Sequence, residues 1–196
     1  MLIKTIFHVL GLLLLIFSLT FLPPMIVSYI YHDGTIPVLF LSSACSFSVG
    51  LILWFPFRGR QSNLRAHDAF IIVVLLWVIA CLFGSLPFYF LEAVDIAFVD
   101  AFFETVSGIT TTGSTALVNL EQLPLSILYY RQQLQFLGGI GIIVMAVAIL
   151  PILGIGGLQL LRAEISGPIQ DTKLTPRIAQ TAKALLSIYL CLTVAC

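Results

Sequence analysis

Apolar stretches long enough to cross a membrane constrain this sequence more than any other feature. A helix of about 20 apolar residues, rising about 1.5 Å per residue, spans the hydrocarbon core of a bilayer. We predict three such helices, at about Thr5–Ile30, Ile36–Phe57 and Asp68–Leu91, and a further long apolar helix at about Pro124–Leu153. The first should kink at Pro23–Pro24, because proline removes a backbone donor.

The composition is that of a polytopic membrane protein. Of the 196 residues, 60% are hydrophobic and 9% are charged, whereas about 25% of residues in soluble domains are charged. Nine basic residues balance nine acidic ones, so the net charge does not favour nucleic acid as a partner. The cysteines form no CxxC pair and no Cys/His cluster, and we interpret all four as small core residues: Cys45, Cys81, Cys191 and Cys196.

The positions of the charges predict the orientation of the helices. Loops rich in Lys and Arg stay in the cytoplasm, which applies to the loops that carry Arg58, Arg60, Arg65, Arg162, Lys173, Arg177 and Lys183. The N-terminus, with Lys4, is then cytoplasmic too. Four acidic residues fall on the outer side: Asp33, Glu92, Asp95 and Glu121. The segment between Glu92 and Glu121 must therefore enter the membrane and return on the same side.

That segment contains a predicted short helix followed by a run of small hydroxyl residues. The helix covers about 95–108, with Asp95 as a plausible N-cap. Its length of about 20 Å falls short of the hydrocarbon core of about 30 Å. Its C-terminal end, which carries about half a negative charge, would point towards residues 110–115 and favour cations there. This arrangement predicts a re-entrant helix and loop.

Residues 110–115, with the sequence Thr-Thr-Thr-Gly-Ser-Thr, are out of place in lipid. Unpaired backbone groups cost several kcal/mol each there, unless the segment lies inside protein or along a water-filled path. Carbonyl oxygens in such a run can replace the hydration shell of a potassium ion, and glycine permits the backbone angles that this requires. Thr111, Thr112 and Gly113 have this chemistry and are the candidate filter residues. An ordinary Ser/Thr-rich external turn is the alternative.

Three charged residues near this run have two interpretations each. Asp100 and Glu104 lie four residues apart on the short helix, where like charges repel. They either concentrate cations at the outer mouth, or face water or an unidentified basic partner. Arg131 lies beside Tyr129 and Tyr130. The favoured interpretation is that its side chain snorkels to the membrane interface within an aromatic belt, and the alternative is a role behind the filter.

Glycines in the Pro124–Leu153 helix have a structural explanation and a functional one. Gly138, Gly139 and Gly141 fit close helix packing better than a hinge or gate. No HExxH or GxSxG motif marks an intramembrane enzyme, and the glycines at 154–157 do not complete a dinucleotide-binding GxGxxG motif.

Three segments make the sequence resemble a known family: DAFFETVSGITTTGSTAL, LPLSILYYRQQLQFLGGIGIIVMAVAILPILGIGGLQLLRAEISGP and LTPRIAQTAK. They resemble the TrkH-type membrane subunit of bacterial Trk potassium-uptake systems, within the Trk/Ktr/HKT potassium-transporter superfamily. The likeness covers essentially the whole chain and includes YHDG at residues 31–34.

The resemblance implies an all-helical membrane protein in which a helix–pore loop–helix unit occurs four times around one pore. Residues 1–67 would form two N-terminal helices and a cytoplasmic loop, 68–153 the first repeat, 154–183 a cytoplasmic loop, and 184–196 the start of the next repeat. Since this last apolar run is too short to cross a membrane, we expect the polypeptide to continue beyond Cys196.

The resemblance also implies function and partners. Potassium would bind the carbonyls around Gly113, those of Thr111 and Thr112 first and that of Ser114 with them. It would do so during selective uptake across the bacterial inner membrane, as a channel or by symport. The family pairs as a homodimer and is gated by a cytosolic nucleotide-binding subunit of the TrkA type. No organic cofactor and no enzymatic activity are expected. The alternatives are a homotetrameric potassium channel, an intramembrane enzyme or an assembly subunit without transport activity.

Overall fold

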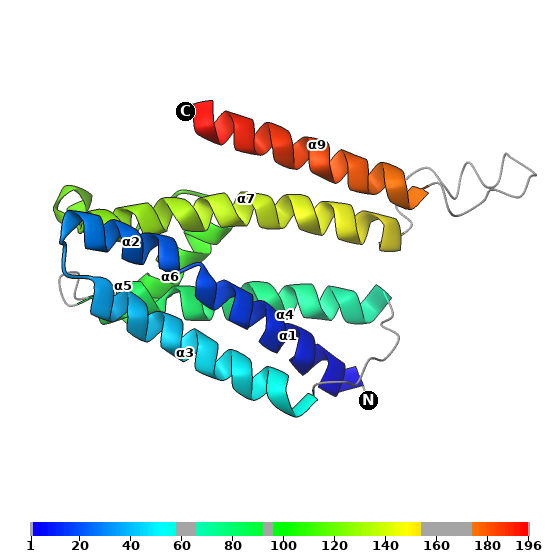
Figure 1. Ribbon diagram of the computed structural model, residues 1–196, viewed down its shortest axis with the longest axis horizontal. Helices are drawn as coiled ribbons and strands as arrows, with labels where there is room; N and C mark the ends of the chain where they lie inside the picture. Colours follow the sequence, from blue (N-terminus) through cyan, green and yellow to red (C-terminus); the bar gives the residue numbers. More distant parts are fainter. Residues whose placement is uncertain (1, 58–65, 92–95, 154–173, 196) are drawn as a thin grey trace, which may run out of the picture. The chain divides into compact units, whose positions relative to one another are not determined.

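The computed structural model describes residues 2–57, 66–91, 96–153 and 174–195. Within these ranges all regular structure is helical and there is no strand, which confirms the predicted all-helical fold (Figure 1). The elements are α1 (Leu2–Leu19), α2 (Leu22–Tyr31), α3 (Ile36–Trp54), η1 (Phe55–Phe57), α4 (Ala66–Gly84), α5 (Leu86–Phe90), α6 (Phe98–Ile109), η2 (Leu120–Gln122), α7 (Leu125–Leu153) and α9 (Leu174–Ala195).

The chain divides into two compact units, Met1–Gly138 and Gly139–Cys196, with the boundary inside α7. The first unit holds α1 to α6 and the N-terminal part of α7. In it α1 packs along α3, and α6 packs against α4 and α5. The second unit holds the rest of α7 and α9.

Three helical stretches among the described residues are long and apolar enough to cross a membrane: Ile6–Tyr31, Ile36–Phe57 and Ile71–Phe90. They confirm the three predicted spans, and their outer faces expose large apolar side chains, such as Phe40 at 65% and Ile52 at 68%. Such faces suit lipid better than water. That α7 also crosses the membrane stays a prediction.

The first span breaks between α1 and α2, directly before Pro23–Pro24, as predicted. Proline has no N–H, so the carbonyl four residues before it loses its helical donor. For Pro24 this is the Thr20 carbonyl, which instead accepts a hydrogen bond of 2.6 Å from Nε2 of Gln133 on α7. A side chain of α7 thus satisfies the carbonyl that the α1–α2 break leaves without a helical donor.

The third span has a similar break, which the sequence interpretation missed. Helix α4 ends at Gly84 and α5 begins at Leu86, with Pro87 at its first turn. At this break the Gly84 carbonyl accepts a hydrogen bond of 2.8 Å from the Tyr130 hydroxyl of α7. Tyr130 is fully buried, and its ring packs against Phe21 and Phe88, with centroids 5.6 and 5.4 Å away. The core of the first unit therefore centres on α7.

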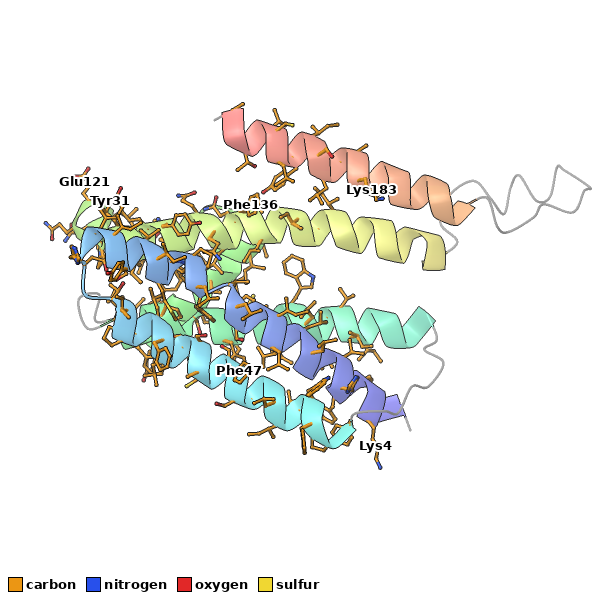
Figure 2. The ribbon with its side chains drawn as sticks, in the orientation of Figure 1. Lys4, Tyr31, Phe47, Glu121, Phe136 and Lys183 are labelled. Carbon is orange, nitrogen blue, oxygen red and sulfur yellow. The ribbon has the colours of Figure 1, made fainter. Side chains whose placement is uncertain are left out.

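The two ends of the first unit differ in charge. Figure 2 shows Lys4 at one end, and Tyr31 and Glu121 at the other. This separation agrees with the predicted assignment of Lys4 and Glu121 to opposite membrane faces. The basic loops Arg58–Arg65 and Arg162–Lys173, and the acids Glu92 and Asp95, lie outside the described residues.

Two predicted helix boundaries and one cysteine assignment were wrong. Helix α6 begins at Phe98 with Ala97 in the N-cap position and no side-chain cap, so the N-cap is not Asp95. Helix α9 begins at Leu174, inside the stretch 154–183 that was predicted to be a loop. Pro176 is compatible with this start, because it lies in the first turn, where its missing N–H removes no helical hydrogen bond. Cys81 is buried and Cys45 half-buried as predicted, but Cys191 is exposed.

Candidate functional site

The loop after α6 is organised by the last carbonyls of that helix. These carbonyls have no intrahelical partner at a helix end. The backbone N–H of Thr111 donates to the Gly108 carbonyl at 2.9 Å, and the N–H of Thr112 to the Ser107 carbonyl at 2.9 Å. The N–H of Gly113 reaches the same Ser107 carbonyl at 3.4 Å. The loop amides therefore face the C-terminal end of α6.

The direction of the loop carbonyls follows from the planarity of the peptide bond. In a trans peptide, the C=O of one residue points opposite to the N–H of the next. Because the amides of Thr111, Thr112 and Gly113 face α6, the carbonyls of the preceding residues Thr110, Thr111 and Thr112 face away from it. In the part of the chain that the structure describes, no donor reaches these oxygens. Three carbonyls are thus left for an external partner.

Left-handed backbone angles make this arrangement possible. Thr111 has φ +57° and Gly113 has φ +79°. A β-branched residue with positive φ is an outlier, and such strain is concentrated at functional sites. At Gly113 a Cβ atom would find no heavy atom within 4 Å. Glycine is therefore required there by the backbone angle and not by lack of space.

The far side of the loop is held by hydrogen bonds to side chains of α6. The Ser107 hydroxyl donates to the Ser114 carbonyl at 2.6 Å. The carboxylate oxygen Oε2 of Glu104 accepts from the Thr115 hydroxyl at 2.9 Å and from the Ala116 N–H at 3.0 Å. The Ser114 carbonyl thus differs from those of Thr110–Thr112, because one of its two lone pairs is already occupied.

The partner of Glu104 is Arg131 of α7. The Arg131 Nε donates to Glu104 Oε1 at 2.5 Å, and the two side chains are only 11% and 2% exposed. Glu104 therefore does not face an outer mouth, so that interpretation is wrong for this residue; the alternative of an unidentified basic partner holds. The favoured interpretation of Arg131 as a snorkelling residue was also wrong, since its guanidinium lies behind the loop. Asp100 is exposed in the first turn of α6, and its role at an outer mouth stays a prediction.

Helices α6 and α7 approach closely where the loop begins. A Cβ atom on Gly138 would lie 2.0 Å from the Ile109 carbonyl oxygen, and one on Gly108 would lie 3.1 Å from Cβ of Leu134. Only glycine at 138 allows this contact. The structure thus supports the packing explanation of Gly138. Within the second unit, a Cβ atom on Gly139 would lie 2.3 Å from the Tyr189 hydroxyl.

The chemistry of the site is that of neutral oxygen donors. Among the described residues, no three His, Cys, Asp or Glu side chains lie close enough together to hold a metal ion. The loop instead offers backbone carbonyls and exposed hydroxyls, next to the negative end of α6. Carbonyl oxygens are suited to weakly held monovalent cations that must bind and leave.

Comparison with known proteins places the chain in a family. Residues 35–196 match the TrkH family, described as cation transport protein. The Trk system potassium uptake protein TrkH of Vibrio parahaemolyticus is 52% identical over 98% of this chain, and that of Escherichia coli K12 is 50% identical over 98%. TrkG of Escherichia coli K12 is 41% identical over 99%.

A solved structure gives the same result. The crystal structure of the potassium transporter TrkH from Vibrio parahaemolyticus matches 100% of this chain with a TM-score of 0.83 and 46% sequence identity, and 38% of that chain is covered. This chain spans about 40% of the length of the curated relatives. The family match nevertheless covers most of this chain, residues 35–196. The chain therefore belongs to the TrkH family of cation transport proteins, which are not enzymes.

Proposed function

We propose that this chain provides the first of four filter segments of a potassium-uptake pore. The observation that carries the proposal is the set of three carbonyls, on Thr110, Thr111 and Thr112, that face away from α6 and accept no hydrogen bond within the described residues. Relatives of the chain carry the name potassium uptake protein. The Gly113 and Ser114 carbonyls complete the proposed filter segment, with Thr111 and Thr112 as the principal ligands of potassium.

The geometry suits selective binding for an electrostatic reason. A potassium ion that leaves water needs several oxygen atoms in place of its hydration shell. The C-terminal end of α6 adds about half a negative charge beside the loop, which attracts a cation without the strong binding of a carboxylate. The buried charge of Glu104 is neutralised by Arg131, so it supports the loop without trapping the ion.

The proposal extends to the architecture of the whole protein. Residues 68–153 form the first helix–pore loop–helix repeat, with α6 as a re-entrant helix of about 18 Å, too short to cross the membrane. The protein resides in the bacterial inner membrane with its N-terminus in the cytoplasm. It pairs as a homodimer and binds a cytosolic nucleotide-binding subunit of the TrkA type. Uptake by symport is part of the same proposal.

The test uses the full-length polypeptide in liposomes. We expect potassium flux that greatly exceeds sodium flux, with empty liposomes as the control. Imposing a proton or sodium gradient at fixed potassium distinguishes symport, which the gradient drives, from a passive channel. A full-length protein that is folded and monodisperse but carries no potassium would contradict the proposed function and favour an assembly subunit.

A further inference from the structure

Helix α7 presents two different faces to the rest of the first unit. Ile127, Arg131, Leu134 and Gly138 follow the spacing of one helix face, and three of them contact α6 directly: Arg131 at Glu104, Leu134 at Gly108, and Gly138 at Ile109. This face supports the proposed filter. Ser126, Tyr130 and Gln133 share the neighbouring face, about 100° around the helix axis, by their spacing of four and three residues.

The second face contacts the α1–α3 segment, although the Tyr130 hydroxyl on this face donates to Gly84 at the α4–α5 break. Gln133 donates to the Thr20 carbonyl at the α1–α2 break at 2.6 Å, and Tyr130 packs on Phe21 at the same break. At the N-terminus of α7, the Ser126 N–H donates to Oδ2 of Asp33 at 3.0 Å. Helix α7 is therefore held at three successive turns by helices that lie outside the helix–pore loop–helix repeat.

Asp33 is the centre of the strongest of these contacts. Its Oδ1 accepts hydrogen bonds from the Ser28 hydroxyl, from the Thr35 N–H at 3.2 Å and from the Thr35 hydroxyl at 3.0 Å. The Thr35 and Ser126 hydroxyls share a further bond of 2.5 Å. Ser28, Thr35 and Ser126 are at most 2% exposed. A carboxylate of one helix pair thus caps the N-terminus of another helix, where negative charge is favoured.

We propose that Asp33 is a positioning residue for ion selectivity: from the external turn between α2 and α3, it fixes the N-terminus of α7 and thereby the Arg131–Glu104 support of the filter loop. Ser126 and Arg131 are five residues apart on one rigid helix, about 7.5 Å along its axis. A shift of α7 at its N-terminus moves the Arg131 guanidinium, which donates a hydrogen bond to Oε1 of Glu104. The other carboxylate oxygen of Glu104 accepts hydrogen bonds from Thr115 and Ala116, so the shift reaches the loop. The inference rests on the proposed function of residues 110–114 as a filter.

The test is Asp33→Asn in the full-length protein, with the ratio of potassium to sodium flux as the readout. The carboxamide keeps the size of the side chain but places an N–H₂ group against the Ser126 or Thr35 donors. We expect the ratio to fall about threefold or more, which corresponds to roughly 0.7 kcal/mol, in protein of normal yield and monodispersity. Gln133→Leu, which breaks the separate bond to Thr20, should lower the ratio in the same direction.

The control is Glu121→Gln, which removes an exposed carboxylate at the same end of the unit. If Asp33 acted only by attracting cations to the surface, both variants would weaken potassium and sodium transport alike, and the ratio would not change in either. An unchanged ratio in both Asp33→Asn and Gln133→Leu, while Gly113→Ser lowers it, would overturn the positioning role and leave the filter intact. An unchanged ratio in Gly113→Ser as well would overturn the proposed filter itself.

Discussion

The Arg131 guanidinium and the Glu104 carboxylate form a buried ion pair directly behind the loop 110–116, with Nε and Oε1 2.5 Å apart. Removing one partner of such a pair leaves an uncompensated charge in the protein interior, whereas removing both leaves none. The pair therefore makes the conformation of the loop depend on Arg131 of α7, which lies 27 positions after Glu104 in the sequence.

Single substitutions of this pair should destabilise the protein strongly. We expect Glu104→Gln or Arg131→Met to cost about 3 kcal/mol of unfolding free energy each, and the double variant to cost less than their sum. Thermal unfolding of the full-length protein in detergent measures this, with Glu121→Gln as an exposed control that should change stability by less than about 0.5 kcal/mol. Costs that simply add would show that the two side chains do not interact.

Gly138→Ala should prevent normal packing of α7 on α6. A Cβ atom there would lie 2.0 Å from the Ile109 carbonyl oxygen, which is backbone and cannot rotate away. Overpacking of this kind typically lowers the free energy of unfolding by about 1–3 kcal/mol. We expect a lower yield of folded protein and a lower unfolding temperature. Ile142→Ala, at an exposed position of α7, is the control; equal behaviour of the two variants would contradict the close contact.

Stability should depend on pH through Asp33. Burial alone would raise the pKa of its carboxyl, but hydrogen bonds from Ser126, Ser28 and Thr35 outweigh burial and lower the pKa from 3.8 to about 2. Because the folded pKa is the lower one, the stabilisation is complete above about pH 5 and is lost as pH falls towards 2. It amounts to about 1–2 kcal/mol after allowance for screening by solvent.

The measurement is the difference in unfolding free energy between the native protein and Asp33→Asn. We expect this difference to be constant between pH 7 and 5 and to shrink between pH 4 and 2. A difference that is independent of pH over the whole range would show that the charge of Asp33 contributes nothing to the cap of α7.

The sequence predicted the three apolar spans and a non-helical segment after α6, but it missed the break at Gly84, two helix starts and the contacts that hold the loop. Apolar length located the three spans, because lipid imposes a minimum helix length, and Gly113 was found because positive φ favours glycine. The partners of Glu104 and Asp33 lie 27 and 93 residues away, and no local pattern encodes such pairings. One usable signal was missed: Pro24 leaves the Thr20 carbonyl without its helical donor, and Gln133 is a polar side chain in an apolar helix.

The orientation of the helices is tested by single cysteines in a full-length background without native cysteines. We expect an impermeant thiol reagent on the outer side to label Glu121→Cys, and not Ser62→Cys or Gln170→Cys, because basic loops remain in the cytoplasm. Labelling of position 62 or 170 from outside would overturn the orientation and, with it, the re-entrant course of α6.

The central claim is that residues 110–114 select potassium, and its most direct test is the ratio of potassium to sodium flux in full-length Gly113→Ser. The serine side chain has free space at this position, so the substitution acts through the backbone, where φ is +79°. A Cβ atom there costs roughly 1–2 kcal/mol, and relaxation of this strain would turn the neighbouring carbonyls.

The matched control is Asn119→Val, which places similar strain at an exposed loop residue with φ +55° outside the filter. We predict that the flux ratio falls by up to about tenfold in Gly113→Ser and keeps its native value in Asn119→Val, with both proteins folded. A native ratio in Gly113→Ser would show that the loop is an ordinary turn and would contradict the account.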